Sequence, residues 1–451
     1  MQMKDYTQGP IGRQIIDLAL PIMGIAFIQM AYTLADLFWI GHLGSIHTAA
    51  VGAGGIFLWI AQSLCLTTKV GAEITISQSL GAKRFQRAYR FARHALALSI
   101  LFGLACGIVM LLARRPLIAF YGFQEEQTVE LAVTYLGIIA TGMVFTFVNF
   151  TYFGMYTGNG HSRMALIANG TGLTINLLLD PLMINGYLGF PQLGVAGAGY
   201  ATVFSQGIVT LIFWGVNLRR GAPFHRVFHG FRPSRLLAWR IVAIGAPVAA
   251  QSVLFALVAM TLARLVARWG DMGVAIMSLG ADIEALSWMT ATGFASALGS
   301  FVGQNWGAGN YQRVRRGYRV TLAYSLSLAL LATLIFIFLG RPLFGLFIPE
   351  PEAMAEGGRY LRIMGYAQLL MVLEITTSGV FNGIGRTSIP AYTGIALNLL
   401  RIPLALWWGS YSLSGIWWAI GLSMMLKGLV LCAWLLLEMR RFPDRRTIRP
   451  A

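Results

Sequence analysis

The chain has 451 residues, of which 57% are hydrophobic and 11% are charged, whereas charged residues make up about 25% of a soluble domain. Its net charge of +17 raises the question of nucleic-acid binding, but no soluble domain presents basic residues interleaved with aromatics. The composition therefore excludes an ordinary soluble domain and indicates a protein embedded in the lipid bilayer, with no nucleic-acid partner.

Long apolar runs recur along the chain, each near the ~20 residues with which a helix crosses a bilayer. Six spans are expected in the first half, at 15–41, 52–80, 94–113, 128–150, 166–187 and 194–218. Six more are expected in the second half, at 241–266, 273–303, 320–340, 360–382, 388–410 and 414–438. The predicted fold class is an all-α membrane protein with twelve transmembrane helices.

Two stretches of the chain are copies of each other. Residues 76–93 read ISQSLGAKRFQRAYRFAR and residues 302–319 read VGQNWGAGNYQRVRRGYR, so position 76 corresponds to position 302. Pro21 and Pro247 keep the same offset in numbering, and the offset shortens gradually toward the pair Gly207 and Gly428. Internal repeats of this kind are typical of membrane transporters.

The repeat divides the chain into an N-terminal six-helix lobe (1–220), a cytoplasmic linker (221–240) and a C-terminal six-helix lobe (241–451). An even number of spans per half gives both halves the same orientation, as in a parallel repeat. The segments on one side of the predicted spans hold 24 Lys and Arg residues, against 7 on the other side. By the positive-inside rule, both termini and the linker are cytoplasmic. We expect a multi-pass protein of a bacterial inner (plasma) membrane.

Charged residues inside predicted spans are costly, so each needs a reason. Asp36 lies late in the first span, Asp180 lies two-thirds along the fifth and Thr202 lies early in the sixth, which places all three in the outer half of the membrane. Asn176 precedes Asp180 by four residues and shares its helical face. This set of hard oxygen ligands suits a proton or a Na⁺ ion, with no other cofactor or metal.

The two acids Asp36 and Asp180 are not duplicated, although the sequence around them is. Asp36 aligns with Leu262 and Asp180 aligns with Ile402, so the second half keeps neither carboxylate. A purely structural role would more plausibly survive in both halves, which favours ion coupling. A hydrogen-bonded structural pair is the alternative.

Further charged residues within spans are candidates for a substrate-binding cleft. Lys69 and Glu73 are separated by one helical turn, so they can form an ion pair that eases insertion or a pair that takes part in gating. Glu284 and Glu374 lie near mid-membrane in the second half, and Trp288 follows Glu284 by one turn. An acid beside an aromatic ring can bind an organic cation, and the alternative is a polar contact between helices.

These residues and motifs resemble the multidrug and toxic compound extrusion (MATE) family over nearly the whole chain. The resemblance is carried by Asp36 before FWIGHLG, by Asn-x3-Asp-Pro at 176–181, by GIGRT at 383–387 and by the repeated Gln-x-x-Gly-Ala. The first-half acids are similar to those of the DinF-like branch. That similarity implies an ion site at Asp36, Asn176, Asp180 and Thr202, and a bend of the first helix at Pro21.

The resemblance implies a monomeric efflux antiporter, which exports amphipathic and often cationic compounds in exchange for H⁺ or Na⁺. Its partners are then small organic molecules and the lipid bilayer. A flippase for a lipid-linked precursor is an alternative within the same superfamily, and it would need a cationic cleft. An intramembrane enzyme is a third interpretation, but no H-E-x-x-H, G-x-S-x-G or D-D-x-x-D motif is present. The protein is therefore not expected to be an enzyme.

Overall fold

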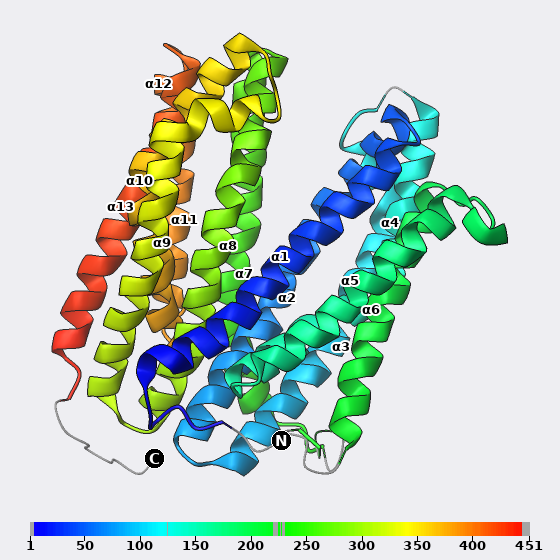
Figure 1. Ribbon diagram of the computed structural model, residues 1–451. Helices are drawn as coiled ribbons and strands as arrows, with labels where there is room; N and C mark the ends of the chain where they lie inside the picture. The colour runs from blue at the N-terminus through cyan, green and yellow to red at the C-terminus, as the bar shows by residue number, and fades with distance from the viewer. Residues whose placement is uncertain (1–3, 124, 220–223, 226, 228–230, 444–451) are drawn as a thin grey trace. The chain divides into compact units, whose positions relative to one another are not determined.

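The computed structural model describes residues 4–123, 125–219, 224–225, 227 and 231–443, and among them every regular element is a helix (Figure 1). Twelve helical spans in this part of the chain are long and apolar enough to cross a membrane, which confirms the predicted fold class. The helices are α1 (Ile11–Gly41), α2 (Ser45–Gly81), α3 (Phe85–Ala119), α4 (Glu126–Gly158), α5 (Ser162–Asn185), α6 (Val195–Leu218), α7 (Arg235–Val266), α8 (Asp271–Gly307), α9 (Tyr311–Gly345), α10 (Pro351–Gly383), α11 (Ser388–Leu399), α12 (Arg401–Trp408) and α13 (Leu413–Arg440).

Several helices extend beyond the predicted spans, because hydropathy finds only the apolar part of each one. α3 begins well before the predicted 94–113, and α7 begins at Arg235, inside the predicted linker 221–240. The earlier part of that linker lies partly outside the described residues. The predicted span 388–410 is interrupted at Leu400, between α11 and α12. Pro403 follows closely, and its missing N–H removes the bond that would continue the helix across Leu399.

The repeat is visible in the helix boundaries themselves. The first and last residues of α8 are those of α2 shifted by the same number of positions that separates the two sequence copies. The same shift relates α9 to α3. For α4 and α10, the shift between the corresponding helix ends is one residue smaller. Each position in these helices therefore has a structural counterpart in the other half.

One helix crossing is copied in atomic detail. On α4, a Cβ atom added to Gly154 would overlap the backbone oxygen of Lys69 on α2. On α10, the equivalent Gly379 stands in the same way against the backbone oxygen of Ala295, whose counterpart in the first half is Lys69. In both helices a second glycine follows after four residues, as in the small-residue motifs that let membrane helices approach closely. The glycines therefore set the spacing of the central helices.

The chain forms two compact units whose limits differ from the predicted lobes. The first unit consists mainly of Gly24–Ala249, and the second consists of Asp5–Met23 with Ala250–Ala451. α1 and α7 therefore each begin in one unit and end in the other. Both changes fall just after a proline, Pro21 in α1 and Pro247 in α7, and these two prolines are counterparts in the repeat. The helices are continuous through both prolines, and the bend expected at Pro21 stays a prediction.

The segment around Tyr6 and Gly9 is held within the second unit by the repeated motif. The backbone N–H of Tyr6 donates to Gln304 Oε1 at 2.9 Å, and the Tyr6 carbonyl accepts from Asn305 Nδ2 at 3.2 Å and Arg313 Nε at 3.0 Å. Arg313 also donates to the carbonyl of Gly9 at 2.8 Å. The duplicated motif thus anchors the peptide that precedes α1.

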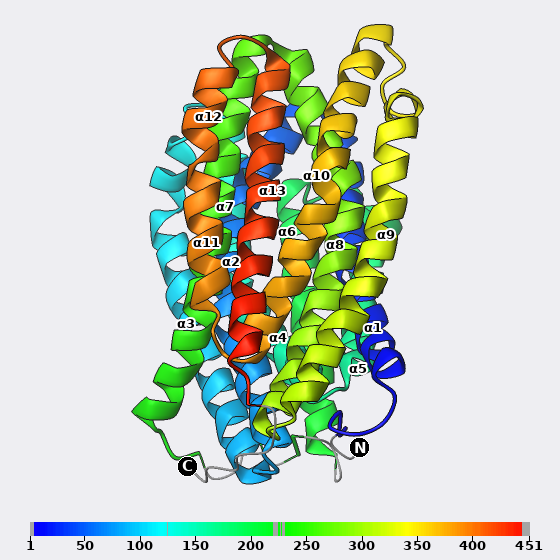
Figure 2. The same ribbon diagram turned by 90° about the vertical axis from the view of Figure 1, so that its left-hand side faces the viewer.

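Each unit is built around one central helix. α4 packs against α2, α3 and α6 in the first unit, and α10 packs against α8, α9 and α13 in the second. The latter four helices lie side by side in Figure 2. α4 and α10 are also the most deeply buried of the candidate spans. Several polar side chains on these two helices, among them Asn149 and Glu374, are consequently buried within the protein.

Candidate functional site

A cavity of about 420 Å³ lies inside the first unit, between α1, α2, α4, α5 and α6. Its wall is largely aromatic and aliphatic, with Tyr32, Trp59, Tyr135, Phe150 and Phe153 among the lining side chains. Small-molecule sites commonly have this volume and this mixture of apolar wall with few polar groups. The cavity is therefore a candidate binding site for an organic molecule.

Asp36 is the acidic residue among the side chains that line this cavity. Its carboxylate lies close enough to that of Asp180 for the two to interact directly. Asp180 is fully buried, and its Oδ1 accepts a hydrogen bond from Asn176 Nδ2 at 3.2 Å. The structure therefore brings both predicted acids and Asn176 into one region, next to the cavity.

Six buried oxygen atoms in this region carry no hydrogen bond of normal geometry to any described residue. They are Tyr32 OH, Asp36 Oδ1, Asn176 Oδ1, Asp180 Oδ2, Thr202 Oγ1 and Ser205 Oγ. Several of these oxygens lie next to one another, Tyr32 beside Thr202 and Ser205, and Asp36 beside Asp180. Buried polar groups are usually paired with good geometry, so this arrangement has capacity to bind a further group. Such an oxygen-rich set fits a hard cation or protons, and we call these six side chains the oxygen cluster.

Four members of the oxygen cluster are predicted from the sequence, whereas Tyr32 and Ser205 are not. Tyr32 precedes Asp36 by one turn of α1, and Ser205 follows Thr202 by three residues on α6, so each shares a helical face with a predicted residue. Helical spacing was therefore the signal that could have identified them.

A pair of amides forms another polar part of the cavity wall. Asn149 Nδ2 on α4 donates to Gln206 Oε1 on α6 at 2.8 Å, and Thr210 Oγ1 donates to Asn149 Oδ1 at 2.8 Å. Asn149 and Gln206 both line the cavity. These groups are neutral, so they can orient a polar ligand without adding charge.

Lys69 and Glu73 lie on α2, beside the crossing with α4. The Lys69 ammonium stands 4.3 Å from the ring centroid of Phe153, and Glu73 is buried. Phe153 lines the cavity, whereas neither Lys69 nor Glu73 is among the lining residues. Their role at a substrate cleft stays a prediction.

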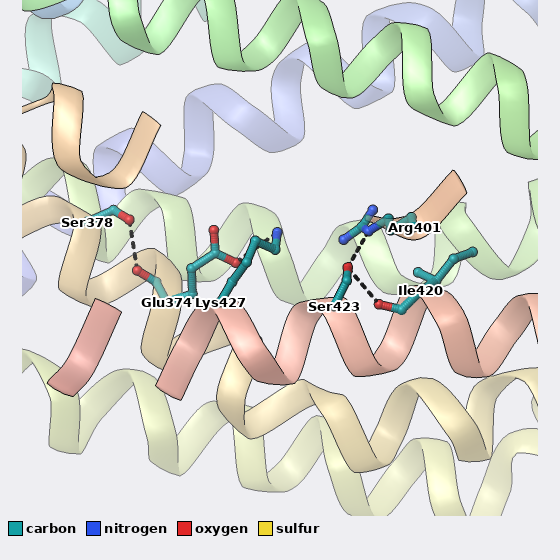
Figure 3. Close-up of polar contacts among 6 residues, drawn as sticks. All are labelled: Glu374, Ser378, Arg401, Ile420, Ser423 and Lys427. Carbon is teal, nitrogen blue, oxygen red and sulfur yellow. Dashed lines mark hydrogen bonds and ion pairs between the residues drawn. The ribbon is translucent and has the colours of Figure 1, made fainter. Parts of the chain in front are cut away.

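In the second unit, four charged residues gather between α8, α10, α12 and α13: Glu284, Glu374, Arg401 and Lys427, all buried. Lys427 Nζ lies 3.1 Å from Glu374 Oε2, and Arg401 Nε donates to Ser423 Oγ at 2.5 Å (Figure 3). Glu284 Oε1 and Arg401 Nη2 have no hydrogen-bond partner among the described side chains. Glu284 and Glu374 are predicted from the sequence, whereas the pairing of Glu374 with Lys427 is found only in the structure.

Trp288 lies one turn after Glu284 on α8 and is 42% exposed, whereas Glu284 is buried. The two side chains therefore differ in accessibility, although helical spacing places them near each other. Contact of Glu284 and Trp288 with a cationic substrate stays a prediction. Glu374 is different, because an ammonium of the chain itself already neutralises it.

The chain is similar to known proteins in both halves of its repeat. A family model described as MatE matches residues 21–182 and 247–407, once on each half of the repeat. The chain is 28% identical over 405 residues to the probable multidrug resistance protein NorM of Thermotoga maritima, covering 88% of this chain and 85% of that protein. It is 26% identical over 445 residues to a FAD transporter of Shewanella oneidensis, covering 95% of each.

A solved structure titled as the outward-facing conformation of a multidrug resistance MATE family transporter of the MOP superfamily also matches. Its TM-score is 0.91 at 24% identity, over 99% of this chain and 100% of that one. At this identity the likeness establishes a shared fold.

Proposed function

The chain belongs to the MatE family, and from this membership we propose that it is a secondary active multidrug efflux antiporter. It is a membrane transporter and not an enzyme. In the proposed cycle, inward flow of H⁺ or Na⁺ drives the export of amphipathic, often cationic compounds. The observation that carries the proposal is the position of Asp36, which lines the cavity and also belongs to the oxygen cluster.

The Asp36 carboxylate, which the cavity and the oxygen cluster have in common, offers a physical basis for the exchange of an organic cation against H⁺ or Na⁺. An organic cation in the cavity is attracted by the negative charge of Asp36, whereas a proton or Na⁺ bound in the oxygen cluster neutralises that charge. The two ligands therefore compete for one electrostatic interaction, and neither needs to touch the other. Ion binding at Asp36, Asn176, Asp180 and Thr202 would also bias the conformational equilibrium, provided the ion binds one state more tightly.

Transport in proteoliposomes tests this function and identifies the ion. The purified protein would be reconstituted, and the movement of a cationic dye would be followed under a proton gradient alone and under a Na⁺ gradient alone. We expect dye movement against its own gradient under one of the two conditions, with collapse when an ionophore dissipates that gradient. Dye movement that ignores both gradients would contradict an antiport mechanism.

The proposed orientation places both termini on the cytoplasmic side of a bacterial inner membrane, with the protein acting as a monomer. Gln192 and Ser412 lie in exposed loops on one predicted side, and Gln86 and Gln312 lie on exposed helix starts on the other. We expect single cysteines at Gln192 and Ser412 to react with an impermeant maleimide in intact cells. Cysteines at Gln86 and Gln312 should react only after the cells are opened, and labelling of either in intact cells would reverse the orientation.

The composition of the cavity favours efflux of organic cations over the flippase alternative. A lipid-linked pyrophosphate would require basic groups, yet the described lining residues include Asp36 and neither Lys nor Arg. The basic side chains Arg401 and Lys427 lie in the second unit, in contact with groups of the chain itself. The enzyme alternative is set aside by the family membership.

A further inference from the structure

The second unit contains an ion pair in its interior, between Glu374 on α10 and Lys427 on α13 (Figure 3). The carboxylate and the ammonium are 3.1 Å apart, and each side chain is less than a tenth exposed. Taking two charges out of water costs free energy that their mutual attraction often fails to recover. The pair therefore needs an explanation beyond stability.

The repeat shows that this helix contact does not require charge. Glu374 occupies the position of Asn149 in the first half, and Lys427 occupies that of Gln206. Asn149 and Gln206 are hydrogen-bonded to each other at 2.8 Å. The same contact between a central helix and the last helix of the half is thus neutral in one unit and ionic in the other.

A second cation of the second unit contacts the counterpart of a cavity residue. Arg401 donates to Ser423, and Ser423 occupies the position of Thr202, a member of the oxygen cluster in the first unit. Arg401 is also within electrostatic reach of Glu374 and Glu284. In the second unit, Lys427 therefore occupies the counterpart of the cavity-lining Gln206, and Arg401 binds the counterpart of the cavity-lining Thr202.

We propose that Lys427 is a tethered counter-cation, which permanently occupies the cation-binding position beside Glu374. The second unit then binds no mobile cation there, and the coupling ion is confined to the oxygen cluster of the first unit. This inference rests on the proposed transport function for its meaning, but its physical content is a binding property that can be measured without transport.

Removal of the ammonium should open a cation site, because Glu374 then lacks its partner in a low-dielectric interior. Lys427→Ala deletes the atoms of the side chain beyond Cβ, which correspond in size and charge to propylammonium. We expect propylammonium to raise the melting temperature of purified Lys427→Ala saturably, and 1-propanol of similar size to have no such effect. If the alanine variant does not fold, the melting temperature of Lys427→Gln, a smaller change in side-chain volume, would be measured with Na⁺ and with propylammonium.

The control variant comes from the chain itself. Glu374→Asn/Lys427→Gln copies the amide pair of the first unit, so it should fold and should show only the cation response of the wild type. Any cation response of the double variant comes from the first unit, and it is subtracted from the response of the Lys427 variants. Folded Lys427 variants that gain no cation response over the double variant would overturn the proposal. A wild-type cation response that Glu374→Gln removes would overturn it as well, since Glu374 would then bind a mobile ion.

Discussion

Asp36→Asn and Asp180→Asn should each reduce gradient-driven export to the level of liposomes without protein. Either change leaves one carboxylate in the oxygen cluster where the wild type has two, so the remaining acid binds a proton or a Na⁺ ion without its neighbour, and exchange should fail. Folding should be retained, because an unpaired buried charge is unfavourable to the folded state. In Asp180→Asn, the new amide oxygen can still accept the hydrogen bond that Asn176 donates at 3.2 Å.

The measurement is dye transport in proteoliposomes at matched protein content, together with the melting temperature of each variant. Asp271→Asn is the matched control, since it makes the same substitution at an exposed acid in the first turn of α8. It should transport as the wild type does. A well-folded Asp36→Asn protein with the wild-type rate would show that Asp36 is not the coupling group, and the same holds for Asp180.

Gly154→Ala should destabilise the first unit strongly, although it adds a single methyl group. The added Cβ would collide with the backbone oxygen of Lys69, so one helix must move away from the other. Overpacking of this kind costs about 1–3 kcal/mol. Backbone atoms cannot relieve the collision by rotation, so we expect the upper end of that range.

The matched control for this substitution is Gly215→Ala on α6, where a Cβ would meet no atom within 4 Å. It should leave the melting temperature unchanged or raise it slightly, because alanine favours the helix over glycine. Gly379→Ala, the counterpart of Gly154→Ala in the second half, should reproduce the loss. Equal melting temperatures for Gly154→Ala and Gly215→Ala would show that the crossing tolerates a wider spacing.

The sequence was most informative where the physical signal is local or duplicated. Span number followed from hydropathy, and the separation between copies predicted which helices correspond. The neighbourhood of Asp36 and Asp180 could be inferred from the depth of each residue along its span. The depth of a residue in the membrane follows directly from its position along the helix.

Contacts between helices were harder to predict from the sequence, because they depend on how each helix is rotated about its own axis. The pairing of Glu374 with Lys427 requires one face of α10 to meet one face of α13, and no single span contains that information. The unpaired oxygens of Tyr32 and Ser205 became visible only when three helices were assembled. The division of α1 between two units also depends on tertiary packing and leaves no mark in hydropathy.

That division has a consequence for the origin of the fold. Each repeat contributes its first helical turns to the unit formed by the other: Asp5–Met23 belongs to the second unit, and the start of α7 belongs to the first. A single repeat with the same division would lack this segment in its own unit, and two copies with these segments exchanged would complete each other. Gene fusion would then have converted a domain-swapped homodimer into one chain. The two copies have also diverged in charge: the first carries Asp36 and Asp180 where the second carries Leu262 and Ile402.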